Sequence, residues 1–176
     1  MINELLRSRR SIRKYKEQSL PVEKIKLLKE VCLLSPTSKN KKPCEFIFVE
    51  NKESLKILSQ VKPKGGQMIA SSALSIIVTA DPGISDVWIE DASIVSAYLH
   101  LACHDLGLGS CWVQIRKRMN NYEENITSES IIKKAFHIPD NYKVLSIIAV
   151  GYPDESKEGH QMESLTNESI HQEFYK

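Results

Sequence analysis

The sequence lacks the run of about 18 or more apolar residues that a membrane-spanning helix needs. Its first residues, "MINELLRSRR", also lack the apolar core of a signal peptide. Four cysteines occur in 176 residues and none forms a C-x-x-C pair. This scarcity argues against a disulfide scaffold and favours reduced thiols. We therefore expect a cytoplasmic protein with no membrane partner.

Net charge is also small. The chain carries 24 basic and 22 acidic side chains, a formal net charge of +2. Nucleic-acid-binding domains are usually strongly basic, so we expect no nucleic-acid partner. One local cluster stands out: "RRSIRKY" places Arg9, Arg10, Arg13 and Lys14 beside Ser11. Guanidinium groups bind phosphate oxygens through paired hydrogen bonds, so this cluster suits one small anion.

Several catalytic motifs are missing. No G-x-S-x-G, no phosphate-binding P-loop and no G-x-G-x-x-G occurs, which removes the usual devices of three large enzyme classes. His100 and His104 have the i, i+4 spacing by which two imidazoles can share a metal. The residues between them are Leu-Ala-Cys, without the glutamate of a metalloprotease. We favour two structural histidines and expect no metal site.

Hydrophobic patterning predicts alternating helices and strands within one domain, residues 1–176. The predicted helices are 2–10, 22–34, 52–61, 86–106 and 128–136, and the predicted strands are 44–50, 73–80, 109–115 and 143–151. The strand "ALSIIVTA" is almost wholly apolar, which predicts cover on both faces. Residues 116–127 are predicted to be a loop and 154–176 a polar tail. The pattern indicates an α+β fold with a central mixed sheet covered by helices.

Three separated segments suggest a binding site. They are the arginine cluster, "SPTSKN" at 35–40 with its hydroxyls and amide, and "LGLGSCWVQ" at 106–114 with small residues and Trp112. Taken singly, each is explained more simply as solvated charge, a turn or the entry to a strand. Their order and spacing along the chain are more informative than any one of them.

In this combination the chain resembles the nitroreductase family of FMN-dependent oxidoreductases, from about Leu5 to Pro153. The resemblance rests on "RRSIRKY" (9–15), "SPTSKNKKP" (35–43), "LGLGSCWVQ" (106–114) and "FHIPDNYKVLSIIAVGYP" (136–153). The short length and "WIEDASI" (88–94) are similar to the compact branch of that family. The resemblance implies a mainly antiparallel sheet, a homodimer and FMN at its interface.

The resemblance also implies roles for individual residues. The FMN phosphate and the pyrimidine edge of the ring would contact Arg9, Arg10, Ser11 and Arg13, and the phosphate site would be completed near Lys157 and His160. The partner subunit would contribute Pro36, Thr37, Ser38 and Asn40. The flavin ring would lie along Gly109, Ser110, Cys111, Trp112, Val113 and Gln114. FMN would carry the redox chemistry, so no catalytic side chain is expected.

The implied activity is electron transfer from NADH or NADPH to a small organic acceptor such as a nitroaromatic or a quinone. Lys42 and Cys44 stand where the family commonly has glutamine and a large aromatic, so the substrate side would differ in shape and charge. We expect the tail, 154–176, to embrace the partner subunit. Two alternatives stay open: a flavin-binding protein without turnover, and a basic patch with Lys39, Lys41 and Lys42 that binds nucleic acid.

Overall fold

The computed structural model describes residues 1–162, 165–166 and 168–175. Its centre is a four-stranded sheet in the order β1-β2-β6-β3, formed by β1 (Cys44–Val49), β2 (Leu74–Ala80), β6 (Lys143–Gly151) and β3 (Gly109–Gln114). Every neighbouring pair in this sheet is antiparallel. We expected a mixed sheet; parallel pairing among the described residues is limited to one bridge, between Ser11 and Ser110.

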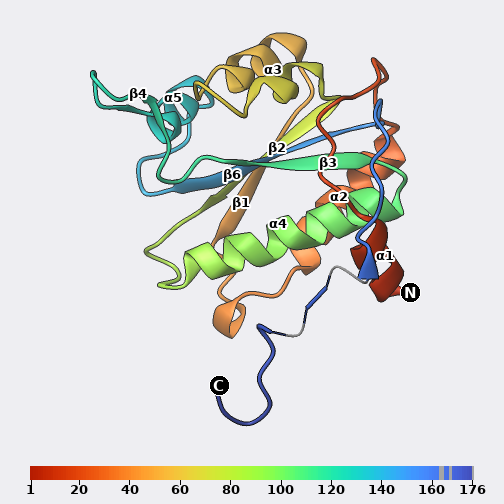
Figure 1. Ribbon diagram of the computed structural model, residues 1–176. Helices are drawn as coiled ribbons and strands as arrows, with labels where there is room; N and C mark the ends of the chain where they lie inside the picture. The colour runs from red at the N-terminus through yellow and green to blue at the C-terminus, as the bar shows by residue number, and fades with distance from the viewer. Residues whose placement is uncertain (163–164, 167, 176) are drawn as a thin grey trace.

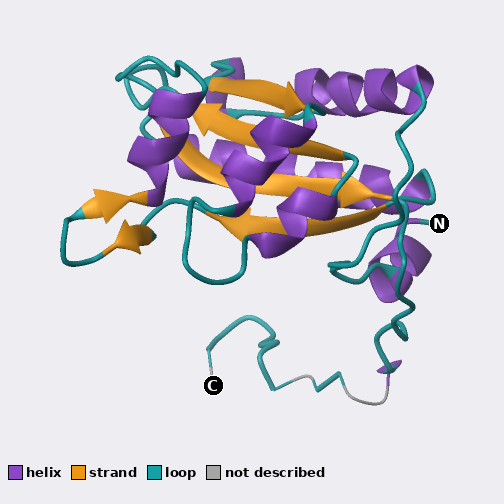
Figure 2. Cartoon of the chain, turned by 90° about the horizontal axis from the view of Figure 1, so that it is seen from above, coloured by secondary structure: helices purple, strands orange, loops and turns teal. Residues whose placement is uncertain are grey.

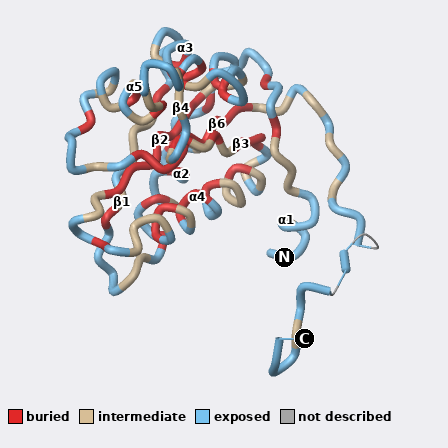
Figure 3. The backbone as a smooth tube through the Cα atoms, turned by 60° about the vertical axis from the view of Figure 1, so that its left-hand side comes forward, coloured by how far each residue is buried: buried red, intermediate tan, exposed pale blue. Residues whose placement is uncertain are grey.

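Helices cover both faces of the sheet. Helices α2 (Val22–Leu34) and α4 (Trp88–Asp105) lie on one face, and α3 (Lys52–Ser59) and α5 (Ser128–Ala135) lie on the other (Figures 1 and 2). All seven residues of β2 are buried, as the apolar run predicts. Successive side chains of a strand point to opposite faces, so Ile76 packs with α2 and α4 while Ile77 packs with α3 and α5. Burial is concentrated in the sheet (Figure 3).

The shorter elements are α1 (Ile2–Ser8), η1 (Ser38–Asn40), η2 (Gln67–Ser71) and a hairpin of β4 (Met119–Asn121) with β5 (Ile126–Thr127). The predicted loop at 116–127 was therefore wrong in part, because these short strands are polar and show no apolar alternation. Helix α1 ends two residues before the predicted end, since Arg9 is already extended (φ −62°, ψ 126°). The arginine cluster thus lies beyond the helix.

A glycine stop ends the longest helix and starts the edge strand. Gly107 has φ +70°, a conformation that favours glycine. The Leu108 N–H donates to the Cys103 carbonyl at 2.7 Å and the Gly107 N–H to the His104 carbonyl at 3.0 Å. These two bonds form a Schellman turn. The turn sends the chain directly into β3 and so places Ser110 against the end of α4.

Within the residues that the structure describes, no helix is both long and apolar enough to cross a lipid bilayer.

Candidate functional site

The arginine segment, residues 9–15, runs along the outer edge of β3. The Ile12 N–H donates to the Ser110 carbonyl at 3.0 Å, next to the Ser11–Ser110 bridge. Gly109 makes this approach possible, because a Cβ there would lie 2.7 Å from the Ile12 Cβ. The buried Tyr15 hydroxyl donates to the Ile12 carbonyl at 2.6 Å. The backbone that carries the arginines is therefore fixed at both ends.

The start of the tail fixes the same segment from its other side. We call residues 152–160 the tail clasp; they run antiparallel to residues 7–16, and the two segments lie side by side in Figure 1. Backbone bonds join Lys16 N to Tyr152 O (2.9 Å), Asp154 N to Lys14 O (2.9 Å) and His160 N to Arg7 O (2.8 Å). The sequence prediction put this tail on the partner subunit. Its first residues pack on their own chain, and the embrace of a partner subunit stays a prediction.

Four cations gather along this edge. Arg9 and Arg10 are half-buried and Arg13 is exposed. None of these arginines takes part in the ion pairs found among the described residues. Arg10 donates to the Glu158 carbonyl. Lys157 donates to the Ser11 carbonyl at 2.7 Å and lies 3.3 Å from the Glu155 carboxylate. Along this edge the cationic side chains therefore outnumber the carboxylates that contact them, which favours the binding of an anion.

His160, the other predicted tail residue, lies further along the clasp. It is exposed and lines a pocket of about 400 Å³ with Leu6 and Arg7 of α1. Its backbone, rather than its ring, makes the bond to Arg7. The structure thus brings Lys157 to the arginine segment at Ser11, while His160 lies beside α1.

The two histidines of α4 each bond a hydroxyl group on a different element. The His100 Nδ1 and the Ser110 hydroxyl are 2.7 Å apart, and the His104 Nε2 and the Ser8 hydroxyl are also 2.7 Å apart. These contacts tie the end of α4 to β3 and to α1. Burial, with the Arg9 charge as a second cause, lowers the pKa of His100 from 6.5 to about 4. His100 is therefore neutral near pH 7.

This pKa predicts a loss of stability in acid. As pH falls from 6.5 towards 4, the unfolded chain takes up a proton at His100 that the folded chain does not, so the folded state is destabilised. We expect the wild type to lose about 2 kcal/mol more of its unfolding free energy between pH 7.5 and 4.5 than His100→Asn, which cannot titrate there. Urea unfolding of both proteins at the two pH values measures the difference. Equal losses would contradict it.

The predicted ring contacts on β3 do not share one face. Ser110, Trp112 and Gln114 alternate with Gly109, Cys111 and Val113 along the strand. Trp112 packs on the α4 side and donates from Nε1 to the Gln114 Oε1 at 2.9 Å, whereas Val113 is buried on the α3 side. β3 is the edge strand of the sheet, and at Ser110 its outer edge is covered by the arginine segment.

The loop that contains Pro36, Thr37, Ser38 and Asn40 is held at the other end of α4. The Ser38 N–H donates to Asp91 Oδ1 at 2.7 Å, and Asp91, 2% exposed, also accepts from the Ser85 hydroxyl at 2.8 Å. The Lys42 N–H donates to the Thr37 hydroxyl at 3.0 Å. The backbone is strained, because Lys39, Asn40 and Lys42 all have φ between 49° and 55°.

Asp91 and His100 are nine residues apart on one helix, which is about 14 Å along its axis. Within one chain the loop and the arginine segment therefore lie near opposite ends of α4, as Figure 1 shows. The structure brings together the arginine segment, β3 and Lys157. It leaves the loop separate.

Sequence reasoning missed two acidic residues that hold these segments. Asp91 anchors the loop, and Glu155 accepts from the backbone N–H groups of Arg13 (2.5 Å) and Lys14 (3.3 Å). Glu155 is separated from Arg13 by 142 positions, so no local pattern could reveal the contact. For Asp91, its position in the first turn of a helix was the only signal, and that is common in any helix.

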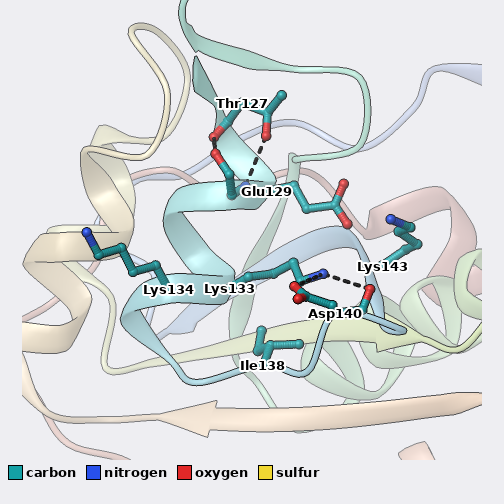
Figure 4. A pocket seen from close by; sticks show the side chains of 8 residues that line it. Thr127, Glu129, Lys133, Lys134, Ile138, Asp140 and Lys143 are labelled. Carbon is teal, nitrogen blue, oxygen red and sulfur yellow. Dashed lines mark hydrogen bonds and ion pairs between the residues drawn. The ribbon is translucent and has the colours of Figure 1, made fainter. Parts of the chain in front are cut away.

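A separate pocket of about 430 Å³ lies beside α5, on the α3 side of the sheet (Figure 4). Lys133 spans it, donating to the Asp140 carbonyl at 3.0 Å and lying 3.3 Å from the Asp140 carboxylate. The contacts between Lys133 and Asp140 thus fix the turn between α5 and β6. Across the described parts of the chain, no group of three or more His, Cys, Asp or Glu could hold a metal ion.

Comparison with known proteins identifies the class of this protein. The nitroreductase family profile matches residues 6–64 and 62–152. The chain is 32% identical over 174 residues to a protein of Archaeoglobus fulgidus, provisionally named an NADH dehydrogenase/NAD(P)H nitroreductase. That match covers 96% of this chain and 95% of the relative. The chain belongs to the nitroreductase family and is an oxidoreductase, so the predicted family and fold are confirmed.

Solved structures agree. An FMN-dependent nitroreductase from Clostridium difficile R20291 superimposes with a TM-score of 0.94 at 41% identity, over 97% of this chain and 98% of that one. A protein of Clostridium acetobutylicum, provisionally named an NADH oxidase, superimposes with a TM-score of 0.85 at 28% identity, over 97% and 99%.

Proposed function

We propose that the protein is an FMN-dependent oxidoreductase that takes electrons from NADH or NADPH and passes them to a small organic acceptor. The observation that carries this proposal is the arginine segment. Its three guanidinium groups form no ion pair with a carboxylate among the described residues, and their backbone is fixed against an edge strand. This donor set fits the phosphate dianion of FMN, because guanidinium and ammonium groups bind phosphate through charge-assisted hydrogen bonds. Arg9, Arg10, Arg13 and Lys157 would hold the phosphate.

When bound, FMN supplies hydride and electron transfer, and the protein supplies binding, orientation and electrostatics. The backbone edge of β3 would lie beside the flavin ring, and the neighbouring cations would favour negative charge on it. His100 is neutral and engaged with Ser110, so it keeps the end of α4 in place without exchanging protons near pH 7. No side chain of the segment needs to act as a general acid or base.

A homodimer completes the proposed site. One chain holds its phosphate-binding segment and its 36–40 loop near opposite ends of α4, and in the proposed homodimer the loop of the second copy would reach each flavin. Large apolar side chains are exposed on α4 and on the two helices near it: Ile94 and Tyr98 on α4, Ile2 and Leu6 on α1, and Leu33 and Leu34 on α2. In the tail, Ile170, Phe174 and Tyr175 are 72%, 76% and 90% exposed. The described end of the tail, residues 168–175, extends away from the body (Figure 1). They are available to a partner; residues 163–164, 167 and 176 of the predicted embrace lie outside the described residues.

The acceptor is proposed as a class, a nitroaromatic or a quinone. Lys42 and Cys44 line a small pocket under the loop with Thr37 and Asp91. If the loop reaches the partner's flavin, an exposed lysine stands at the substrate side in place of a neutral residue. This charge would favour acceptors that carry an anionic group.

Absorbance and turnover test the function. We expect the purified protein to show oxidised-flavin bands at about 370 and 450 nm. We also expect it to oxidise NADH or NADPH faster when a nitroaromatic or a quinone is added. A yellow protein without turnover would favour the flavin-binding alternative. A protein that stays colourless after incubation with FMN, yet binds RNA with a steep salt dependence, would favour the nucleic-acid alternative.

A further inference from the structure

We propose that Glu155 is a positioning residue for the phosphate-binding segment: its carboxylate holds the Arg13–Lys14 backbone and Lys157 in the arrangement that binds a phosphate. This inference rests on the proposed function, because the phosphate is that of FMN. It adds a residue that makes no contact of its own with an anion and that would, by its charge alone, repel one.

One oxygen atom makes all the contacts. Glu155 Oε1 accepts from the Arg13 N–H at 2.5 Å and from the Lys14 N–H at 3.3 Å, and it lies 3.3 Å from the Lys157 Nζ. Lys157 in turn donates to the Ser11 carbonyl at 2.7 Å. The single oxygen therefore connects Lys157 with Arg13 and Lys14, which lie more than 140 positions earlier in the sequence. The Arg13 N–H bond is the main cause that lowers the pKa of Glu155, so the group is a carboxylate at neutral pH.

The rest of the clasp explains why this contact matters. On either side of Glu155, backbone bonds join Asp154 to Lys14 and His160 to Arg7. Between those two bonds, the arginine segment is held to the tail by side chains alone: Glu155, Lys157 and the Arg10 guanidinium on the Glu158 carbonyl. Removing the Glu155 carboxylate leaves two backbone donors without an acceptor and frees Lys157 from one of its two partners.

Two substitutions separate position from charge. In Glu155→Gln, the amide oxygen can make the same three contacts as Oε1, and only the negative charge is lost. In Glu155→Ala, both are lost. We expect Glu155→Ala to bind FMN about tenfold more weakly than the wild type, the effect of unpaired donors in a loosened segment. We expect Glu155→Gln to stay within about threefold. Asp154→Ala is the matched control, because it removes a neighbouring exposed charge whose side chain makes no hydrogen bond or ion pair among the described residues.

Riboflavin provides a readout that a merely structural role would not move. It has the flavin ring without the phosphate, so a defect in the phosphate-binding segment should weaken the binding of FMN more than the binding of riboflavin. Fluorescence titration of the full-length flavin-free protein with each ligand measures the ratio. Equal weakening of both ligands by Glu155→Ala would overturn the proposal. Tighter FMN binding by both Glu155 variants would overturn it as well, because Glu155 would then act as a repelling charge.

Amide hydrogen exchange distinguishes this proposal from the proposed function. In flavin-free protein we expect Glu155→Ala to speed exchange at the Arg13 and Lys14 amides about tenfold, with Glu155→Gln near the wild type. If the wild type binds no FMN at all, the proposed function fails, and exchange still decides whether Glu155 holds the segment. Unchanged exchange in Glu155→Ala would overturn the positioning role even if FMN binds.

Discussion

Replacement of Arg9 and Arg13 by alanine will give a folded protein that purifies without its flavin bands. Each guanidinium is expected to make charge-assisted hydrogen bonds to the phosphate, worth about 1.5–3 kcal/mol apiece. Losing both should raise the dissociation constant for FMN by roughly a hundredfold to ten-thousandfold. Neither arginine has an ion-pair partner within the described chain, so the fold should lose little stability. Fluorescence titration with FMN measures the change.

A matched control removes two cations elsewhere. Arg118 and Lys134 are exposed and lie outside the arginine segment, on the hairpin side of the molecule and on α5. Arg118→Ala with Lys134→Ala lowers the net charge by the same amount, so it reports any general electrostatic effect on an anionic ligand. We expect this control to bind FMN within about twofold of the wild type, because distant exposed charges are screened by salt. A yellow Arg9→Ala, Arg13→Ala protein would place the phosphate somewhere else.

The elements that the sequence predicted well are those whose signal is local. The buried strands β2 and β6 are continuous apolar runs, and α2 follows Pro21 with a regular apolar spacing, so their bounds came within a residue of the structure. The hairpin of β4 and β5 was missed because its residues are polar and its strands are short. A mixed sheet contains parallel pairing, and among the described residues that pairing is limited to the Ser11–Ser110 bridge. The turn at Gly107 places Ser110 for this bridge.

The candidate site divides in the same way. Residue types indicated an anion site at 9–13, and the structure brings Lys157, which the family resemblance had implied, to this segment through the Ser11 carbonyl. The sequence could not reveal the contacts that hold these segments in place. Glu155, Asp91 and the tail clasp each bond residues more than 50 positions away in the chain. Successive side chains of β3 point to opposite faces of the sheet, so the six predicted ring contacts, 109–114, cannot all lie on one surface. In the proposed homodimer the 36–40 loop would reach the flavin of the second chain, so the test of that contact is a test of assembly.

Ile94→Asp together with Tyr98→Asp is expected to convert the protein to a monomer that no longer retains FMN. The two side chains are one helical turn apart on α4 and are 39% and 45% exposed, so they share a face that points away from the sheet. In a single chain aspartates there would stay in water and leave the fold intact. At a helix–helix contact between two copies, each would become a buried charge without a partner. That penalty is about 3 kcal/mol or more, a factor of at least about a hundred in the dimer dissociation constant.

Size-exclusion chromatography with light scattering at micromolar concentration measures the molar mass, and absorbance at about 450 nm measures the bound flavin in the same run. Ile57→Asp is the matched control: Ile57 is 45% exposed on α3, across the sheet from α4, so the same change of an exposed apolar residue to a carboxylate should leave both readings unchanged. Loss of the dimer without loss of FMN would show that each chain holds the flavin alone. Retention of the dimer would place the contact between copies on another face. Only simultaneous loss fits a flavin bound where the loop of one chain meets the arginine segment of the other.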